Sequence, residues 1–369
     1  MMDEKKQFYK EMKEEVNDYF IEKKIDSKAN SQMIIKFFGY LIGLILSYSI
    51  LLFYFDDLSN WKKLILCFSL SIFIMTFKVN NLHDIMHGSF SKNYRYKKYV
   101  SYLLDLLGAS SFIWKNKHNI SHHYYTNNAF IDNDVNVSPI LRFTPHHKLM
   151  NIHRFQKYYT FIVYCFQCYF WFYISDFKNI LKRKITTKNL QGFNSFEICT
   201  FFILKFVHLI IFLYIPSRFV GWSNALIGYF IVYSLAGLML ALIFQVAHIF
   251  ENSHFHSEEN FDDQNEWAKV QIEGSCVFGV NSFFGHWVFG GLHLQVVHHL
   301  FPNICHIHYR AIFPIIEKHC KKNGIKLQKF NNFGQALISH YRQLELLGIG
   351  KAFGDIGLKN AQNRTFEGI

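Results

Sequence analysis

Several features that would identify a soluble class of protein are scarce or missing in this chain of 369 residues. The seven cysteines are scattered and odd in number, so the sequence indicates neither a disulfide framework nor an iron–sulfur cluster. Cys165 and Cys168 form a CxxC, but they lie inside the apolar run FIVYCFQCYFWFYI and are interpreted as packing residues of a helix. The N-terminus, MMDEKKQFYKEMKEEVNDYF, has no apolar core and is therefore not a signal peptide.

A nucleic-acid-binding fold is also missing, although the chain is basic. Its net charge is +12, but there is no Arg-rich patch within a recognisable nucleic-acid-binding motif, so no nucleic-acid partner is expected. What the sequence does have is hydrophobic residues, at 50% of the chain, gathered in long runs flanked by Lys and Arg. This pattern is typical of an integral membrane protein.

Four of the apolar runs approach the length of about 20 residues that a helix needs to cross a bilayer. They pair through the short segments 56–60 and 217–222. The prediction is an all-α integral membrane fold with four transmembrane helices in two hairpins, interfacial helices and a cytoplasmic His-rich cap. The predicted spans are 34–55, 61–78, 200–216 and 223–247.

Three further segments complete the predicted organisation. Residues 1–33 form a cytoplasmic N-terminal segment whose amphipathic helix, at 4–23, lies either on the membrane or on the protein's own body. Residues 34–345 form the main domain, in which 99–113 is read as re-entrant or interfacial, and 346–369 form a C-terminal tail.

The charge pattern orients the chain. Lys and Arg crowd the N-terminus, the 80–157 and 176–190 loops and the C-terminal third, whereas the two short turns carry few. The positive-inside rule then places both termini and every histidine cluster on the cytoplasmic side. A further crossing by residues 158–173 is opposed by the basic residues on both of its flanks.

Histidines gather in three clusters on that side, with the sequences HDIMH, HNISHH and QVVHH. Residues four apart share one face of a helix, which predicts that His83 pairs with His87 and His118 with His122, while His123 turns toward a second metal. Nine ligands are too many for one tetrahedral zinc and fit two metals, although imidazole suits iron, copper and zinc alike. The candidate ligands are His83, His87, His118, His122, His123, His248, Gln295, His298 and His299.

Other polar residues receive supporting interpretations. Asp84, and less directly Asp132 and Asp134, are candidates to orient ligand imidazoles, the alternative for the last two being solvated loop carboxylates. Basic residues of the 142–154 segment could hold a phosphate-bearing head group or only meet anionic lipid. His208, inside a span, is predicted to be a packed neutral histidine. Surface or supporting positions are assigned to His146, His147, His254, His256, His286, His293, His306 and His308.

The three clusters resemble the histidine boxes of membrane fatty acid desaturases, and Gln295 resembles the mark of the front-end subgroup, which inserts a double bond between an existing one and the carboxyl end. SPILR, HRFQKYY, AHIFE and HYRQLELLG extend the similarity through most of the chain. The resemblance implies two non-haem iron ions on the cytoplasmic side. It also implies O2-dependent insertion of a cis double bond into a fatty acyl chain carried by CoA or by lipid.

Two departures from the family pattern matter. The third box reads QVVHH where many front-end members have QIEHH, and no HPGG haem motif occurs, residues 1–33 being too few for a fused cytochrome b5 domain. A separate electron donor of the cytochrome b5 or ferredoxin type is therefore expected, and a bacterial inner membrane is favoured over the endoplasmic reticulum. The alternatives are a sphingolipid desaturase, a lipid hydroxylase, or a haem- or metal-carrying membrane protein without catalysis.

Overall fold

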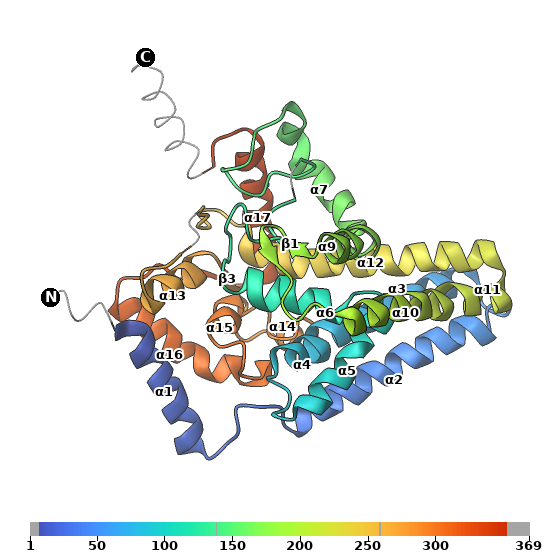
Figure 1. Cartoon of the computed structure of the whole chain (residues 1–369), viewed down its shortest axis with the longest axis horizontal. Coiled ribbons are helices and arrows are strands. Elements are labelled where there is room, and N and C mark those ends of the chain that lie inside the picture. Colours follow the sequence, from blue (N-terminus) through green and yellow to red (C-terminus); the bar gives the residue numbers. More distant parts are fainter. Residues whose placement is uncertain (1–6, 138, 258–259, 353–369) are drawn as a thin grey trace.

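The computed structural model describes residues 7–137, 139–257 and 260–352. Long helices run side by side at one end of the molecule, and the shorter elements gather at the other end (Figure 1). Two of the long helices continue through π-helical turns. The bundle consists of α2 (Ser31–Phe53), α3 (Asn60–Phe77) with η2 (Lys78–Leu82) and α4 (His83–His87), α10 (Ser195–Leu209) with η6 (Ile210–Tyr214) and α11 (Ile215–Val220), and α12 (Trp222–His248).

The described residues contain four helices long and apolar enough to cross a membrane, so the predicted all-α membrane fold is confirmed. The second hairpin turn is tighter than the six residues predicted. Helix α11 continues to Val220, and Gly221 alone separates it from α12. Gly221 has φ 77° and ψ 157°, a conformation that costs glycine little and other residues much, so the chain can reverse at this one residue.

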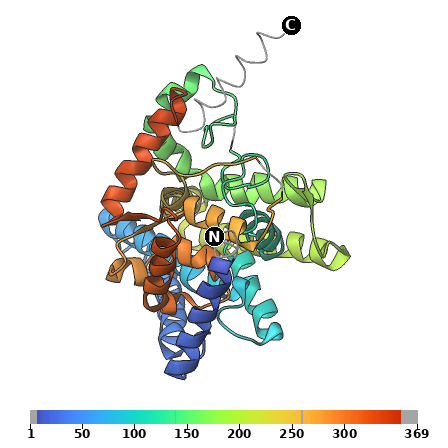
Figure 2. The ribbon, with the colours of Figure 1, turned by 90° about the vertical axis from the view of Figure 1, so that its left-hand side faces the viewer.

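Helix α1 (Phe8–Lys23) lies on the protein's own body, which decides between the two positions expected for it. It packs against α13 (Gln264–Glu273) and α16 (Tyr309–Lys322), at the end of the molecule that faces the viewer in Figure 2. Its apolar stripe, which includes Met12 and Val16, is buried in a cluster shared with these helices. The stripe is therefore satisfied by protein contacts.

The segments predicted to lie outside the spans are short helices that dock on the bundle through buried polar groups. Lys205 of α10 donates to Asp176 Oδ2 at 2.8 Å and to the carbonyl of Gly108 at 2.6 Å. His208 is fully buried, with Nδ1 2.9 Å from a backbone carbonyl and Nε2 2.9 Å from Tyr229 Oη, as a neutral ring requires. The short helices outside the spans are α5 (Tyr94–Leu106), α6 (Ser111–Trp114), α7 (Gln156–Cys165), α8 (Gln167–Tyr169), η5 (Phe170–Ser175) and α9 (Asp176–Lys182).

Two small sheets and the remaining helices complete the His-rich end. β1 (Lys184–Ile185) pairs antiparallel with β2 (Lys188–Asn189), and β3 (Cys276–Phe278) pairs parallel with β4 (Gln328–Phe330). The C-terminal tail was predicted to begin at residue 346. Residues 346–348 belong instead to the last turn of helix α17 (Phe333–Gly348), and residues 353–369 lie outside the described residues. The other elements are η3 (Lys115–His122), η4 (Asn151–Phe155), α14 (Phe283–Trp287), α15 (Gln295–Leu300), η7 (His306–His308) and α17 (Phe333–Gly348).

Candidate metal centre

The long helices carry the first candidate ligands past the bilayer. The helix from Asn60 to His87 has 28 residues and is about 42 Å long, against about 30 Å of hydrocarbon. Its last turns, with His83 and His87, therefore extend beyond the apolar layer. His248 ends α12 in the same way. The other ligands come from η3 and α15, which the cap holds beside these two helix ends.

One group of rings gathers around His118. Its Nε2 lies 3.2 Å from Nε2 of His83 and 3.2 Å from Nε2 of His123. His298 Nε2 is 3.0 Å from that of His123, and the rings of His87 and His298 are 4.9 Å apart. We call these five residues the first group; four of them, all but His123, place their ligand atoms within 4.8 Å of one another.

The second histidine box is π-helical, which adds His123 to the predicted pair of His118 and His122. The backbone N–H of His123 donates to the carbonyl of His118, five residues earlier, at 3.0 Å. A π turn is wider than an α turn, so residues i+4 and i+5 both lie near the face of residue i. The ligand atoms of His118 and His122 lie within 4.8 Å of each other, as predicted, and His122 also belongs to the second group, while Nε2 of His123 reaches His118 in the first group.

The second group consists of His122, His248, His299 and Gln295. The ligand atoms of the three histidines lie within 4.8 Å of one another. The Gln295 side-chain amide reaches both neighbours, with its nitrogen 3.0 Å from Nε2 of His248 and 3.2 Å from Nε2 of His299. Amide oxygen and nitrogen can exchange places by a half turn, so this amide can present its oxygen to the same point.

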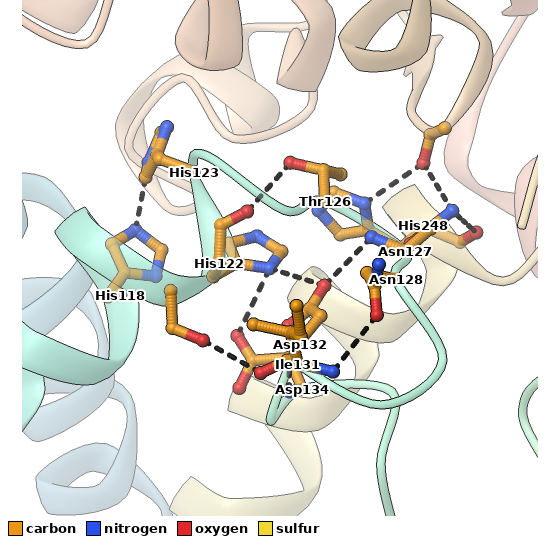
Figure 3. Close-up of polar contacts among 12 residues, drawn as sticks. His118, His122, His123, Thr126, Asn127, Asn128, Ile131, Asp132, Asp134 and His248 are labelled. Atoms are coloured by element: carbon orange, nitrogen blue, oxygen red, sulfur yellow. Dashed lines mark hydrogen bonds and ion pairs between the residues drawn. The ribbon is translucent and has the colours of Figure 1, made fainter. Parts of the chain in front are cut away.

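The Nδ1 atoms of several rings form hydrogen bonds to residues outside the two groups. These bonds orient the rings so that their Nε2 atoms point toward the other ligands. His122 Nδ1 donates to Asp132 Oδ2 at 2.9 Å, as Figure 3 shows, and His248 Nδ1 donates to the Gly274 carbonyl at 3.1 Å. His298 Nδ1 lies 3.1 Å from Tyr309 Oη. Such outer partners fix the tautomer that a metal ligand needs.

His299 is held through a longer network. Its Nδ1 lies 3.0 Å from Thr126 Oγ1, which itself donates to the carbonyl of His122 at 2.8 Å. His299 Nδ1 also lies 2.9 Å from Gln271 Oε1, an acceptor for its proton that leaves Nε2 free to ligate. The sequence carries no signal for Thr126, Gln271 or Tyr309, since these residues are ordinary in type and lie outside the histidine motifs.

The nine candidate ligands have the burial and the unpaired nitrogen and oxygen atoms that a metal-binding site requires. All nine candidate ligands are buried, and Nε2 of His87, Nε2 of His122 and Oε1 of Gln295 have no hydrogen-bond partner among the described residues. Burial, reinforced by the neighbouring rings, holds the pKa of His118, His123, His298 and His299 well below the usual value, so these rings are neutral and free to ligate.

The three candidate aspartates differ in what they contact. Asp132 is fully buried and bonds His122 directly, as expected. Asp134 instead forms an ion pair with Lys117 at 2.7 Å and lies 3.7 Å from His122 Nδ1. Asp84 lies 3.9 Å from His83 Nδ1, too far for a hydrogen bond.

Asp84 holds a different part of the chain, which was not predicted. Its Oδ2 accepts from Nδ1 of His306 at 3.0 Å, and Nε2 of His306 lies 2.9 Å from Nζ of Lys36 in the first span. His306 is fully buried, so it is no surface residue. This contact ties α2 and α4 to the segment that follows the third box.

Arg142, expected to meet a lipid head group, is buried and has a structural role instead. Its guanidinium donates to the carbonyls of His147 at 2.7 Å, Leu347 at 2.7 Å and Pro145 at 2.6 Å. These bonds join the 142–147 loop to the end of α17. The Arg142 head-group prediction is therefore wrong.

Two small cavities with mainly aromatic and aliphatic walls adjoin the first group. One, of about 30 Å³, is lined by Lys78, His83 and Met86, and the other, of about 50 Å³, by Lys117, His118 and Asp134. Both are lined by Trp114, Trp171, Leu240 and Phe244. Walls of this kind suit part of an apolar ligand.

A four-span membrane protein that sets two adjoining groups of buried imidazoles beside an apolar cavity belongs among the multi-histidine membrane proteins of lipid metabolism. The fatty acid desaturase profile matches residues 59–331. The chain belongs to the fatty acid desaturase family and is an oxidoreductase that desaturates fatty acyl chains.

Its relatives are similar over nearly the whole chain. It is 34% identical over 346 residues to an sn-1 linoleoyl-lipid 6-desaturase of Arthrospira platensis, covering 93% of each protein. It is 31% identical over 351 residues to the protein of the same name from Synechocystis, covering 94% of this chain and 96% of the relative. An acyl-lipid (8-3)-desaturase of Physcomitrium patens is 30% identical over 350 residues, which are 94% of this chain and 72% of that protein.

Proposed function

We propose that this protein is a front-end acyl-lipid desaturase that inserts a cis double bond into a chain esterified in a membrane lipid. The observation that carries the proposal is the pair of adjoining imidazole groups, the first of which lines two small, mainly apolar cavities through His83 and His118. The names of the relatives, linoleoyl-lipid 6-desaturase and acyl-lipid (8-3)-desaturase, support the lipid carrier and the front-end position.

The two groups would hold two non-haem iron ions. The first group offers five imidazoles, and the second offers three imidazoles and Oε1 of Gln295. Iron bound there would use dioxygen as the oxidant: the two vicinal hydrogens of the chain, with two electrons from a donor and two protons from solvent, would reduce one O2 to two waters and leave one double bond. Imidazole-rich sites suit iron among other metals, and the family relationship selects it.

The chain's own residues position the substrate and keep water out. Trp114 and Phe244 line both cavities, one beside His83 and the other beside His118, so a methylene lying in either would face the first group across an apolar surface. Fixing one pair of carbons against the reactive centre converts a bimolecular reaction into an effectively unimolecular one. Which pair is held there decides the position of the double bond.

The cytoplasmic side and a separate electron donor, of the cytochrome b5 or ferredoxin type, remain part of the proposal. The distribution of Lys and Arg supports that side. The bacterial inner membrane stays a prediction from the sequence.

Product analysis tests the proposal. The full chain is expressed in a host that lacks front-end desaturases and supplied with linoleate, and the lipids and the acyl-CoA pool are analysed separately by mass spectrometry. A new double bond on the carboxyl side of the existing ones, appearing first in glycerolipid, is expected. A hydroxylated product, or a double bond that appears first in acyl-CoA, would contradict it.

A further inference from the structure

A large cleft beside the third histidine box is used by none of the roles assigned so far. Its volume is about 720 Å³, within the range of small-molecule sites. It is bounded by α14, by the N-terminal half of α16, and by the β4–α17 connection. We call it the α14–α16 cleft.

The cleft has a buried polar residue without a partner. His293 lines it and is 1% exposed, yet its Nδ1 has no hydrogen-bond partner among the described residues. Helix α14 packs directly on this ring, because a Cβ placed on Gly285 would come within 2.7 Å of it. A buried polar atom without a partner is unfavourable, and a ligand that pairs with it would remove that cost.

The charge of the cleft is mainly positive. Arg310 is exposed on its wall and makes no ion pair within the described residues, while Lys329 is bonded to Glu317 at 2.8 Å. The first residues of α17, after its N-cap Asn332, also line the cleft, and the N-terminus of a helix favours an anion. Two cations and a helix N-terminus face a single carboxylate.

Helix α14, which bounds the cleft, carries two exposed phenylalanines beside the lining residues Ser282 and Gly285. Phe283 and Phe284 are 74% and 61% exposed, as apolar side chains at a membrane interface are. Helix α14 is fastened to the first turns of the spanning helix α2, since Lys36 Nζ donates to the His286 carbonyl at 2.6 Å and Tyr40 Oη donates to that of Trp287. A lipid could therefore reach the cleft without leaving the bilayer.

We propose that the α14–α16 cleft binds the phosphate-bearing head group of the glycerophospholipid whose acyl chain is desaturated. The proposal rests on the acyl-lipid, front-end function and adds the class of lipid. A front-end enzyme acts close to the ester, so the head group has to be held near the metals. His293 lies two residues before Gln295, which limits their Cα separation to about 7 Å.

The position of the cleft favours a lipid over the other negatively charged ligand to be considered, an acidic electron-carrier protein. Such a carrier approaches from water and needs an exposed surface, whereas the wall of this cleft includes the buried residues Phe278, His293 and Phe313. The two ligands are distinguished by experiment.

Binding is measured on the purified full chain in a non-ionic detergent, with linoleoyl lysophosphatidylglycerol as the probe. Monolinoleoylglycerol and inorganic phosphate serve as probes that carry only the chain or only the anion. Arg310→Gln should weaken binding of the lysophospholipid about tenfold, the usual effect of losing one charge-assisted hydrogen bond, and leave monolinoleoylglycerol unaffected. Lys321→Gln, the same change on the exposed side of α16 away from the cleft, should change neither.

Three results would overturn the proposal. They are equal lysophospholipid affinity in the wild type and Arg310→Gln, competition by inorganic phosphate as strong as that by the lysophospholipid, and slower reduction by an acidic carrier in Arg310→Gln with unchanged lysophospholipid affinity. If the wild type desaturates glycerolipid in the product assay while Arg310 does not affect binding, only the cleft assignment fails. If the wild type acts on acyl-CoA alone, the proposed carrier fails as well.

Discussion

Replacing Asp132 by Asn tests how the second group of ligands is held. Asp132 Oδ2 accepts from His122 Nδ1 and from the backbone N–H of Asn127, both at 2.9 Å, and Oδ1 accepts from the N–H of Asp134 at 2.9 Å. An amide has one accepting atom where the carboxylate has two, so Asp132→Asn turns its NH2 group either toward the Asp134 N–H, leaving His122 Nδ1 a weaker, uncharged acceptor, or toward His122 itself. In either orientation we expect the His122 ring to be held less firmly.

Loss of such an outer partner typically weakens metal binding about 10–100-fold, which corresponds to about 1.4–2.7 kcal/mol. Because His122 belongs to the second group alone, only the second ion should weaken. The assay is iron content per chain during titration with a chelator of known affinity, on protein purified in detergent. The wild type should release its iron in one late step, and Asp132→Asn should release one ion early.

Asp134→Asn is the matched control. It makes the same chemical change two residues away, in a carboxylate that pairs with Lys117 and lies 3.7 Å from His122 Nδ1. Its chelator curve should stay close to that of the wild type. Identical curves for both variants and the wild type would refute the reasoning that Asp132 positions a metal ligand.

The remaining predictions concern other parts of the centre. His299→Ala should abolish product formation and lose one iron while the protein still inserts in the membrane and elutes as a single species; full activity would remove His299 from the site. Gln295→His should change iron content and activity strongly, and an indifferent result would make Gln295 a packing residue. Tyr309→Phe should weaken the first ion up to about tenfold in the chelator titration, because His298 Nδ1 loses its partner; an unchanged curve would show that packing alone holds the ring. Lys36→Met should lower the melting temperature, since Asn80 Oδ1, the His286 carbonyl and His306 each lose a donor; an unchanged value would contradict a stabilising role.

Much of the architecture could be predicted from the sequence because membrane spans are defined by long apolar runs. The four spans and their pairing follow from these runs, but the helix predicted to end at residue 78 continues through a π turn to His87. The N-terminal helix was predicted from its amphipathic stripe. Its location was not, because an apolar stripe is satisfied equally by lipid and by α16.

The details that could not be predicted depend on local geometry or on distant contacts. The spacing in HNISHH predicts that His118 and His122 lie close together, whereas the contact between His118 and His123 depends on the π turn between them. Asp84 follows His83 in sequence, yet its partner is His306, more than two hundred residues later. Nothing near either residue in the sequence indicates this contact.

The first group has a consequence for biosynthesis. It combines rings that the ribosome makes early, His83 and His87, with His298, which is made when about four fifths of the chain is complete. A nascent chain that has already inserted both of its hairpins still lacks His298, His299 and Gln295. Iron can therefore be retained fully only after the last box has left the ribosome and folded against the helix ends. This order keeps an oxygen-reactive metal out of a half-made protein whose apolar cavity is still open to water.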